Sequence, residues 1–112
     1  MLRRGTLVLI ALDPAKGQEQ KGLRPAVVVG DAVAVQSRRY PLLCVVPLTG
    51  TPGAGALYPP IAPGRSGLAK RSYALIDQLR SVDKRRVTKA FGRVSASEMS
   101  AIEEGVRLYL GL

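Results

Sequence analysis

Arg24 is the residue of this chain best placed to bind a phosphate group. It precedes Pro25, which favours an extended conformation for it, at the start of the apolar run A-V-V-V at 26–29. The polar segment G-Q-E-Q-K-G at 17–22 comes before it, and its two glycines allow it to form a flap. Because a guanidinium can donate two parallel hydrogen bonds to a phosphate, the pattern predicts a phosphate site. An arginine beside a proline is also typical of a strand that simply leaves solvent.

The composition narrows the chemistry and the partners. Lys and Arg total 17 of 112 residues against 8 Asp and Glu, and the formal net charge is +9. A domain this basic is typical of proteins that meet nucleic acid, an anionic membrane or an acidic protein. There is no lysine-rich amphipathic helix, which argues against an anionic membrane as the partner. The chain has no histidine, so His-centred acid–base catalysis is excluded. Its acidic residues are scattered, so neither a metal site nor another cofactor is expected.

The compartment is expected to be the cytoplasm. No apolar run is long enough to span a bilayer. Residues 1–4 (M-L-R-R) resemble the start of a signal peptide, but Asp13 and Pro14 interrupt the apolar stretch that follows. Cys44, the single cysteine, lies in the apolar run 42–46 and is expected to be a buried, inert thiol.

The elements that must position Arg24 are mainly strands within one domain, residues 1–112. We expect a helical turn at 31–36 and a loop rich in Gly and Pro at 50–67, with a hint of a short strand at 57–61. Strands are expected at 6–12, 24–29, 41–47, 73–82 and 90–94, and the second of these is expected to be buried on both faces.

The chain ends in an expected amphipathic helix. Ser95 and Glu98 have capping-box spacing, and Met99, Ile102, Val106 and Tyr109 recur at helical intervals, with Leu110 alongside. This face is predicted to cover the sheet, and a dimer contact is the alternative.

Three motifs in order carry a resemblance to a known family. They are L-D-P-x-x-G-x-E-Q-x-G-x-R-P-A-V-V-V at 12–29, V-V-P-L-T at 45–49 and D-Q-L-R-S-V-D-K-R-R at 77–86. The chain is similar to the MazF/PemK toxins of bacterial toxin–antitoxin modules. The resemblance implies a mainly β fold with helices (α+β by content), an SH3-like small β-barrel of the MazF/Kid/CcdB type with a C-terminal helix. It also implies a homodimer, metal-independent and sequence-specific cleavage of single-stranded RNA to a 2′,3′-cyclic phosphate and a 5′-hydroxyl, and inhibition by an acidic MazE-like antitoxin.

The resemblance also implies roles for individual residues. Arg24 and Thr49 occupy the positions of the catalytic pair in the MazF branch, and Asp77 and Gln78 match an acidic–Gln pair that reads bases. The other expected RNA-binding residues are Gln20, Lys21, Leu57, Tyr58, Ser72 and Arg80. The chain departs from the Kid-like branch at two positions of that branch's catalytic residues, where it has Gln18 and Leu75. These departures favour Arg24 and Thr49 as the catalytic pair.

The chemistry would use the RNA's own 2′-hydroxyl as nucleophile. Arg24 and Thr49 would donate hydrogen bonds to the phosphoryl oxygens, and Arg24 is a poor base because arginine holds its proton. Glu19 is the remaining candidate base, with a flap hydrogen-bonding role as the alternative. Tyr58 and Tyr73 are expected either to stack on bases or to belong to the core. The run 84–86 (K-R-R) is either a solvated turn or a phosphate track.

Two other functions fit parts of the pattern. The same fold serves CcdB-like toxins that target gyrase, although residues 108–112 do not match the aromatic C-terminal segment on which they depend. A non-catalytic RNA-binding barrel would fit the composition alone.

Overall fold

The computed structural model describes residues 2–11 and 22–112. Its strands are β1 (Thr6–Ala11), β2 (Leu23–Val28), β3 (Leu42–Thr49), β4 (Pro60–Ile61), β5 (Ser72–Ala74), β6 (Arg80–Asp83) and β7 (Val87–Arg93). The helices are α1 (Ala32–Gln36) and α2 (Ala96–Leu110), and the 3-10 turns are η1 (Ile76–Gln78) and η2 (Lys84–Arg86). All the strand pairs are antiparallel, in the order β4-β5-β3-β2-β1-β7, with β6 also paired to β3.

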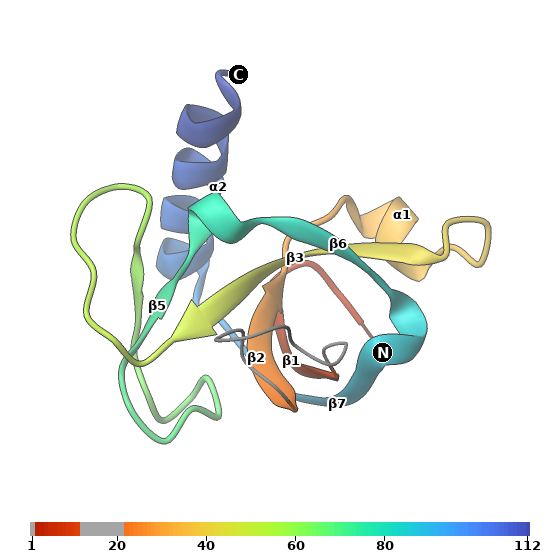
Figure 1. Ribbon diagram of the computed structural model, residues 1–112, viewed down its shortest axis with the longest axis horizontal. Helices are drawn as coiled ribbons and strands as arrows, with labels where there is room; N and C mark the ends of the chain where they lie inside the picture. The colour runs from red at the N-terminus through yellow and green to blue at the C-terminus, as the bar shows by residue number, and fades with distance from the viewer. Residues whose placement is uncertain (1, 12–21) are drawn as a thin grey trace.

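β3 is the strand around which the sheet curls. One of its edges pairs with β2, while the other pairs with β6 through residues 42–45 and with β5 through residues 48–49. Strands twist as they run, so β5 and β6 leave β3 in different directions. The result is the curled sheet of Figure 1, in which α2 rises beyond the sheet and ends away from it.

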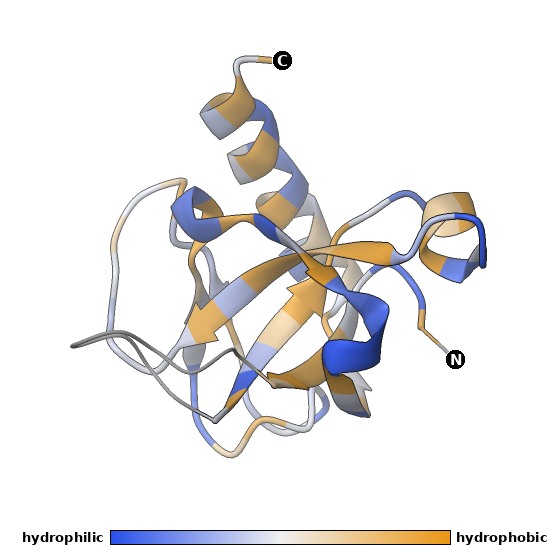
Figure 2. Ribbon diagram, turned by 45° about the vertical axis from the view of Figure 1, so that its right-hand side comes forward, coloured by the Kyte–Doolittle hydropathy of each residue, from blue (hydrophilic) through white to orange (hydrophobic). Residues whose placement is uncertain are grey.

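Both faces of the central strands are buried. One face contributes Leu7, Val27, Val46 and Leu48 to a cluster that also contains Ile76 of η1 and Ile102 of α2. The other contributes Val8, Ile10, Ala26, Val28, Leu43 and Val45 to a second cluster. Residues 26–28 therefore alternate between two cores, which confirms the prediction that this run is buried on both sides. Figure 2 shows the apolar residues concentrated along these strands, whereas η2 is hydrophilic.

The predicted C-terminal helix is confirmed, including its cap. The Glu98 amide donates to Ser95 Oγ (3.1 Å) and the Ser95 amide donates to Glu98 Oε1 (2.8 Å). Ile102 is buried, and a Cβ at Gly105 would lie 2.8 Å from the Ala56 carbonyl oxygen, so glycine lets the helix approach the 50–59 loop. The helix thus covers the sheet over its first turns.

The last turn of the helix extends past the sheet. Tyr109 is 47% exposed and Leu110 is 50% exposed. The alternative role, a dimer contact, stays a prediction for this end of the helix. No helix in the described part of the chain is long and apolar enough to cross a membrane.

The expected strand at 73–82 is wrong as a single element. The chain forms β5, then η1, then β6. The Leu75 amide donates to the Pro47 carbonyl oxygen (2.8 Å) and the Ile76 amide to the Leu57 carbonyl oxygen (3.1 Å). β5 pairs with residues 48–49 of β3 and β6 with residues 42–45, and the polar residues Asp77 and Gln78 occupy the turn between the two strands.

Smaller differences lie in β7, β4 and Cys44. β7 begins at Val87 rather than residue 90, and the hinted strand near 57–61 is reduced to Pro60–Ile61. Cys44 is half-buried rather than buried. Its partial burial raises the pKa of the thiol, which keeps it protonated and supports the expectation of an inert group.

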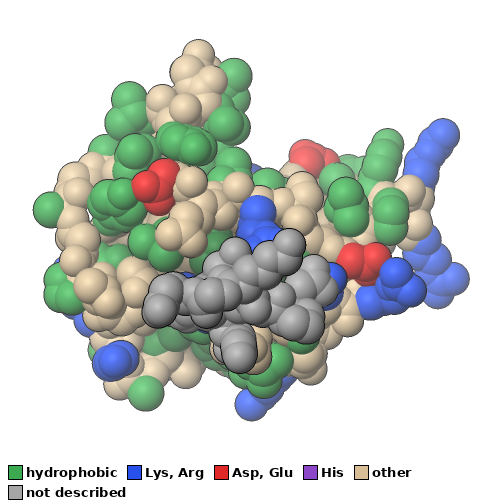
Figure 3. All heavy atoms as spheres, in the orientation of Figure 1, with side chains coloured by type: hydrophobic (Ala, Val, Ile, Leu, Met, Phe, Trp, Pro, Cys, Tyr) green, Lys and Arg blue, Asp and Glu red, His purple; other side chains and the backbone are tan. Residues whose placement is uncertain are grey.

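The basic run 84–86 is not a plain solvated turn, and its role as a phosphate track stays a prediction. Lys84 Nζ donates to the carbonyl oxygens of Ala34 (2.9 Å) and Ser37 (2.8 Å), which fastens η2 to α1. Arg86 Nη1 donates to the Ala11 carbonyl oxygen (3.2 Å). Figure 3 shows Lys and Arg side chains gathered at this edge of the molecule, and Arg85, with 90% of its side chain exposed, reaches solvent there.

Acid is expected to weaken the fold through Asp83, which caps η2. Its carboxylate accepts hydrogen bonds from the Arg85 side chain (3.1 and 2.9 Å) and backbone (2.8 Å), and these lower the pKa of Asp83 from 3.8 to about 2. A lowered pKa stabilises the fold above the unfolded-state value, and this contribution is lost as pH falls from about 4 to about 2. Urea unfolding across that range should show a stability difference between wild type and Asp83→Asn that shrinks with acid. A constant difference would contradict the assignment.

Candidate active site

The strand register brings Arg24 and Thr49 to the same part of the sheet. β2 and β3 pair Val28 with Val45 and Ala26 with Pro47. The pairing of β2 with β3 ends at Ala26 and Pro47. Side chains two positions apart on a strand share a face, so Arg24 belongs to the face of Ala26 and Thr49 to that of Pro47, each two residues beyond this last pair. The two strands therefore bring residues 25 positions apart in sequence to the same end of the sheet.

The Arg24 guanidinium is a partly buried cation. Burial lowers the pKa of Arg24 from its ordinary value. The ion pairs formed among the described residues are Arg4–Glu103 and Arg85–Asp83, so no described carboxylate neutralises Arg24. A guanidinium remains charged near neutral pH even when its pKa falls. Arg24 can therefore hold an anion but is unsuited to remove a proton.

The Thr49 hydroxyl is oriented by its own loop. Its Oγ1 accepts a hydrogen bond from the Thr51 amide (3.1 Å). A hydroxyl has one hydrogen to donate besides its two lone pairs, so the Thr49 O–H remains available as a donor. The arrangement fixes the oxygen at the end of β3 and leaves its hydrogen for a ligand.

Lys70 is a nearby cation that the sequence did not single out. A Cβ at Gly50 would lie 2.9 Å from Lys70 Cε and 3.1 Å from Lys70 Nζ, so the lysine rests on the residue after Thr49. The two are 20 positions apart, and no motif joined them. The only sequence signal for this contact was Gly50, which leaves room for the lysine. A glycine in a loop rich in Gly and Pro is too common to indicate such a contact by itself.

Tyr58 and Asp77, predicted separately, form one unit. Tyr58 Oη donates to Asp77 Oδ2 (2.6 Å), and this hydrogen bond is the main reason that the pKa of Tyr58 is raised. Gly53 permits the contact, since a Cβ there would lie 2.9 Å from Tyr58 Cβ. The bond fastens the 50–59 loop to η1 and leaves Asp77 Oδ1 as an acceptor. Gln78 is exposed beside it on η1.

Thr49 and the Tyr58–Asp77 unit lie at the same end of β3. η1 follows Leu75, whose amide donates to Pro47, two residues before Thr49. The remaining predicted residues differ in access, since Leu57 is half-buried against the core under α2 while Arg80 is exposed on β6. The site is thus built from the ends of β2 and β3, the 50–59 loop and η1.

Ser72 is placed differently from expectation. It is 6% exposed, and its hydroxyl donates to the Lys70 carbonyl oxygen (3.3 Å). In this position the hydroxyl supports the backbone of the Lys70 loop and offers almost no surface to RNA. Glu19, Gln20 and Lys21, with the rest of the predicted flap before Gly22, lie outside the described residues.

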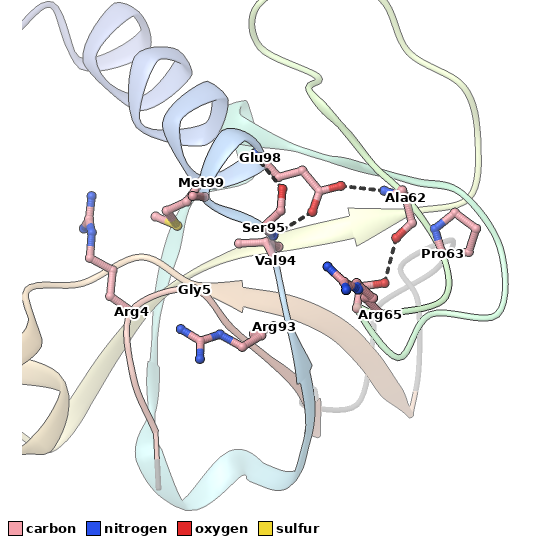
Figure 4. Close-up of a pocket in the computed structure, with 12 residues that line it drawn as sticks. Arg4, Gly5, Ala62, Pro63, Arg65, Arg93, Val94, Ser95, Glu98 and Met99 are labelled. Carbon is pink, nitrogen blue, oxygen red and sulfur yellow. Dashed lines mark hydrogen bonds between the residues drawn. The ribbon is translucent and has the colours of Figure 1, made fainter.

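A separate hollow of about 900 Å³ lies at the first turn of α2. Figure 4 shows Arg4, Arg65 and Arg93 around it, with Glu98 turned toward Ala62 and Ser95. Glu98 is occupied, because its two oxygens accept from the amides of Ala62 (2.7 Å) and Ser95 (2.8 Å). The hollow contains none of the residues predicted from the motifs. Within the described ranges, no three His, Cys, Asp or Glu side chains gather as metal ligands would.

Comparisons with known proteins agree on one family. The family model described as PemK-like, MazF-like toxin of type II toxin–antitoxin system matches residues 3–110. The chain is 35% identical to Endoribonuclease MazF9 of Mycobacterium tuberculosis, covering 100% of this chain and 98% of that protein. It is 29% identical to Endoribonuclease MazF of Staphylococcus saprophyticus, covering 100% and 93%.

Solved structures agree with the fold. A mycobacterial endoribonuclease in complex with its cognate antitoxin superposes with a TM-score of 0.81 at 21% identity, covering 100% of this chain and 97% of that one. MazF from Deinococcus radiodurans superposes with a TM-score of 0.75 at 25% identity, covering 99% and 97%. These likenesses confirm the expected mainly β fold, a curled antiparallel sheet with a C-terminal helix.

Proposed function

The chain belongs to the PemK-like, MazF-like toxins of type II toxin–antitoxin systems, and from this premise we propose that it cleaves single-stranded messenger RNA at a short sequence without a metal ion. It is a toxin endoribonuclease of the MazF type. The observation that carries the proposal is a partly buried Arg24, not neutralised by any described carboxylate, on the strand next to that of Thr49, whose O–H is available to donate.

The proposed reaction is an attack of the RNA on itself. The 2′-oxygen forms a bond to the adjacent phosphorus and gives up its proton, while the bond from phosphorus to the 5′-oxygen breaks and that oxygen takes a proton. The products are a 2′,3′-cyclic phosphate and a 5′-hydroxyl. Arg24 and Thr49 donate hydrogen bonds to the phosphoryl oxygens, where negative charge builds up in the transition state. Glu19 as the base stays a prediction.

Base recognition is assigned to the Tyr58–Asp77 unit and Gln78. Sequence-specific proteins read single-stranded RNA through the Watson–Crick edges of splayed bases. Asp77 Oδ1 can accept from a base, and the Gln78 amide can donate and accept. Leu57, Arg80 and the flap residues Gln20 and Lys21 are proposed to support the strand. Ser72 is proposed to act through the Lys70 loop rather than by touching RNA.

The proposed partners follow from charge and family. A net charge of +9 suits both RNA and an acidic antitoxin of the MazE kind. We propose that the toxin acts as a homodimer in the cytoplasm, where cleavage of messenger RNA would stop translation and growth. The antitoxin would compete with RNA for the basic surface.

The function is tested by incubating the purified protein with a long RNA in EDTA. Discrete cuts whose fragments carry 2′,3′-cyclic phosphate and 5′-hydroxyl ends are the expected result. Protection of the RNA without cuts would indicate a non-catalytic binding barrel instead. Neither cuts nor binding would point to a protein target such as gyrase.

A further inference from the structure

Tyr73 is an aromatic residue beside Thr49 that belongs to neither core. In β5 it pairs directly with Thr49 of β3, so the two side chains share a face. The described chain packs no part of Tyr73 into the two apolar clusters, although its neighbours Ser72 and Ala74 are buried on the opposite face. The ring is half-buried at the sheet surface. Of the two roles expected for Tyr73, the core role therefore has no support in the packing.

Arg71 lies over this ring. Its guanidinium carbon is 5.9 Å from the centre of the Tyr73 ring, within the range of a cation–π contact. Arg71 is exposed, and it forms no ion pair with a described carboxylate. An exposed guanidinium this close to a tyrosine places a positive charge beside an aromatic ring at the sheet surface.

Arg24, Thr49 and Tyr73 come from three successive strands of the sheet. Thr49 of β3 pairs with Tyr73 of β5, and Arg24 lies two residues beyond the last pair of β2 with β3. Neighbouring strands are about 4.8 Å apart, so the ring lies one strand away from the group that is proposed to hold the scissile phosphate. The base of a nucleotide attached to that phosphate is within reach of the ring.

We propose that Tyr73 and Arg71 form a stacking platform for the nucleobase next to the scissile phosphate. This inference rests on the proposed function and adds to it a substrate contact that no motif assigned. Stacking uses the flat face that every base has, so the platform positions the RNA strand without distinguishing one base from another. Recognition of base identity is assigned to Asp77 and Gln78. The tyrosine hydroxyl has no part in stacking, so a phenylalanine should serve equally well.

The platform is tested with a short single-stranded oligonucleotide that contains the cleavage site read from the EDTA digest. The ribose before the scissile phosphate is 2′-deoxy, which removes the nucleophile, and 2-aminopurine replaces the base on either side of that phosphate in turn. Stacking quenches its fluorescence. Wild type and Tyr73→Phe are expected to quench the probe in one of the two positions. Tyr73→Leu should lose the quenching and bind about 5- to 100-fold more weakly.

Arg71→Ala provides a second variant, because its exposed side chain can be removed without affecting folding. It should reduce both the quenching and the affinity. Lys89→Ala is the matched control, since it removes the same charge from an exposed position on β7, at the other end of the strand order. If Tyr73→Leu and Arg71→Ala quench and bind as wild type does, the platform is overturned while the nuclease stands. A wild-type protein that fails to cut RNA would instead contradict the proposed function.

Discussion

Arg24→Ala is expected to slow RNA cleavage at least about 100-fold while the protein stays folded. Removing one preorganised donor from a developing oxyanion typically costs about 100- to 1,000-fold in rate. Arg24 is partly buried and no described carboxylate shares its charge, so its paired donors are available to the phosphate and are lost with the side chain. The measurement is the single-turnover cleavage rate of a defined transcript in EDTA at saturating protein.

Two further variants separate the chemistry of Arg24 from its charge. Arg24→Lys keeps one positive charge but loses the paired donors, so it should recover only part of the rate. Arg93→Ala removes an exposed arginine from β7 and should leave the rate unchanged. Full activity of Arg24→Ala would remove the basis of the proposed mechanism, because it would mean that the phosphate is held elsewhere.

The local elements were the predictable part of the fold. The capping box of Ser95 and Glu98 depends on residues three positions apart, and the spacing alone located the start of α2. The apolar run 26–29 likewise needed no distant partner to be read as a buried strand. The break between β5 and β6 was not predictable in this way. It arises because one edge of β3 pairs with two strands, which is a property of the tertiary pairing.

The candidate site was predictable as a set of names but not as an arrangement. Arg24 and Thr49 came from motifs, whereas the pairing of β2 with β3 that brings them to one end of the sheet is a feature of the folded chain. The Tyr58–Asp77 bond joins residues 19 positions apart and depends on the path of the 50–59 loop. Ser72 shows the limit most clearly. The resemblance implied a contact with RNA, whereas the burial of Ser72 against the Lys70 loop depends on the pairing of β4 with β5.

Thr49→Val is expected to lower the cleavage rate about 100-fold, because valine keeps the shape of threonine and lacks its hydroxyl. Thr49→Ser retains the donor and should keep most of the activity. The Thr51 amide loses its acceptor in the valine variant, but Thr51 is exposed, so water can replace the bond and the stability should change little. The same single-turnover assay measures the rates, and a thermal melt checks the fold.

The double variant tests whether Arg24 and Thr49 act on one phosphate. If they do, each hydrogen bond depends on the other to hold the phosphate in place, and the loss in Arg24→Ala/Thr49→Val should be smaller than the product of the two single losses. Residues acting at separate phosphates would instead give losses that multiply. Because Arg24 and Thr49 lie on one face of the sheet, each two residues beyond the last pair of β2 with β3, we expect the coupled result. A purely multiplicative loss would place the threonine away from the reacting phosphate even if both single variants are impaired.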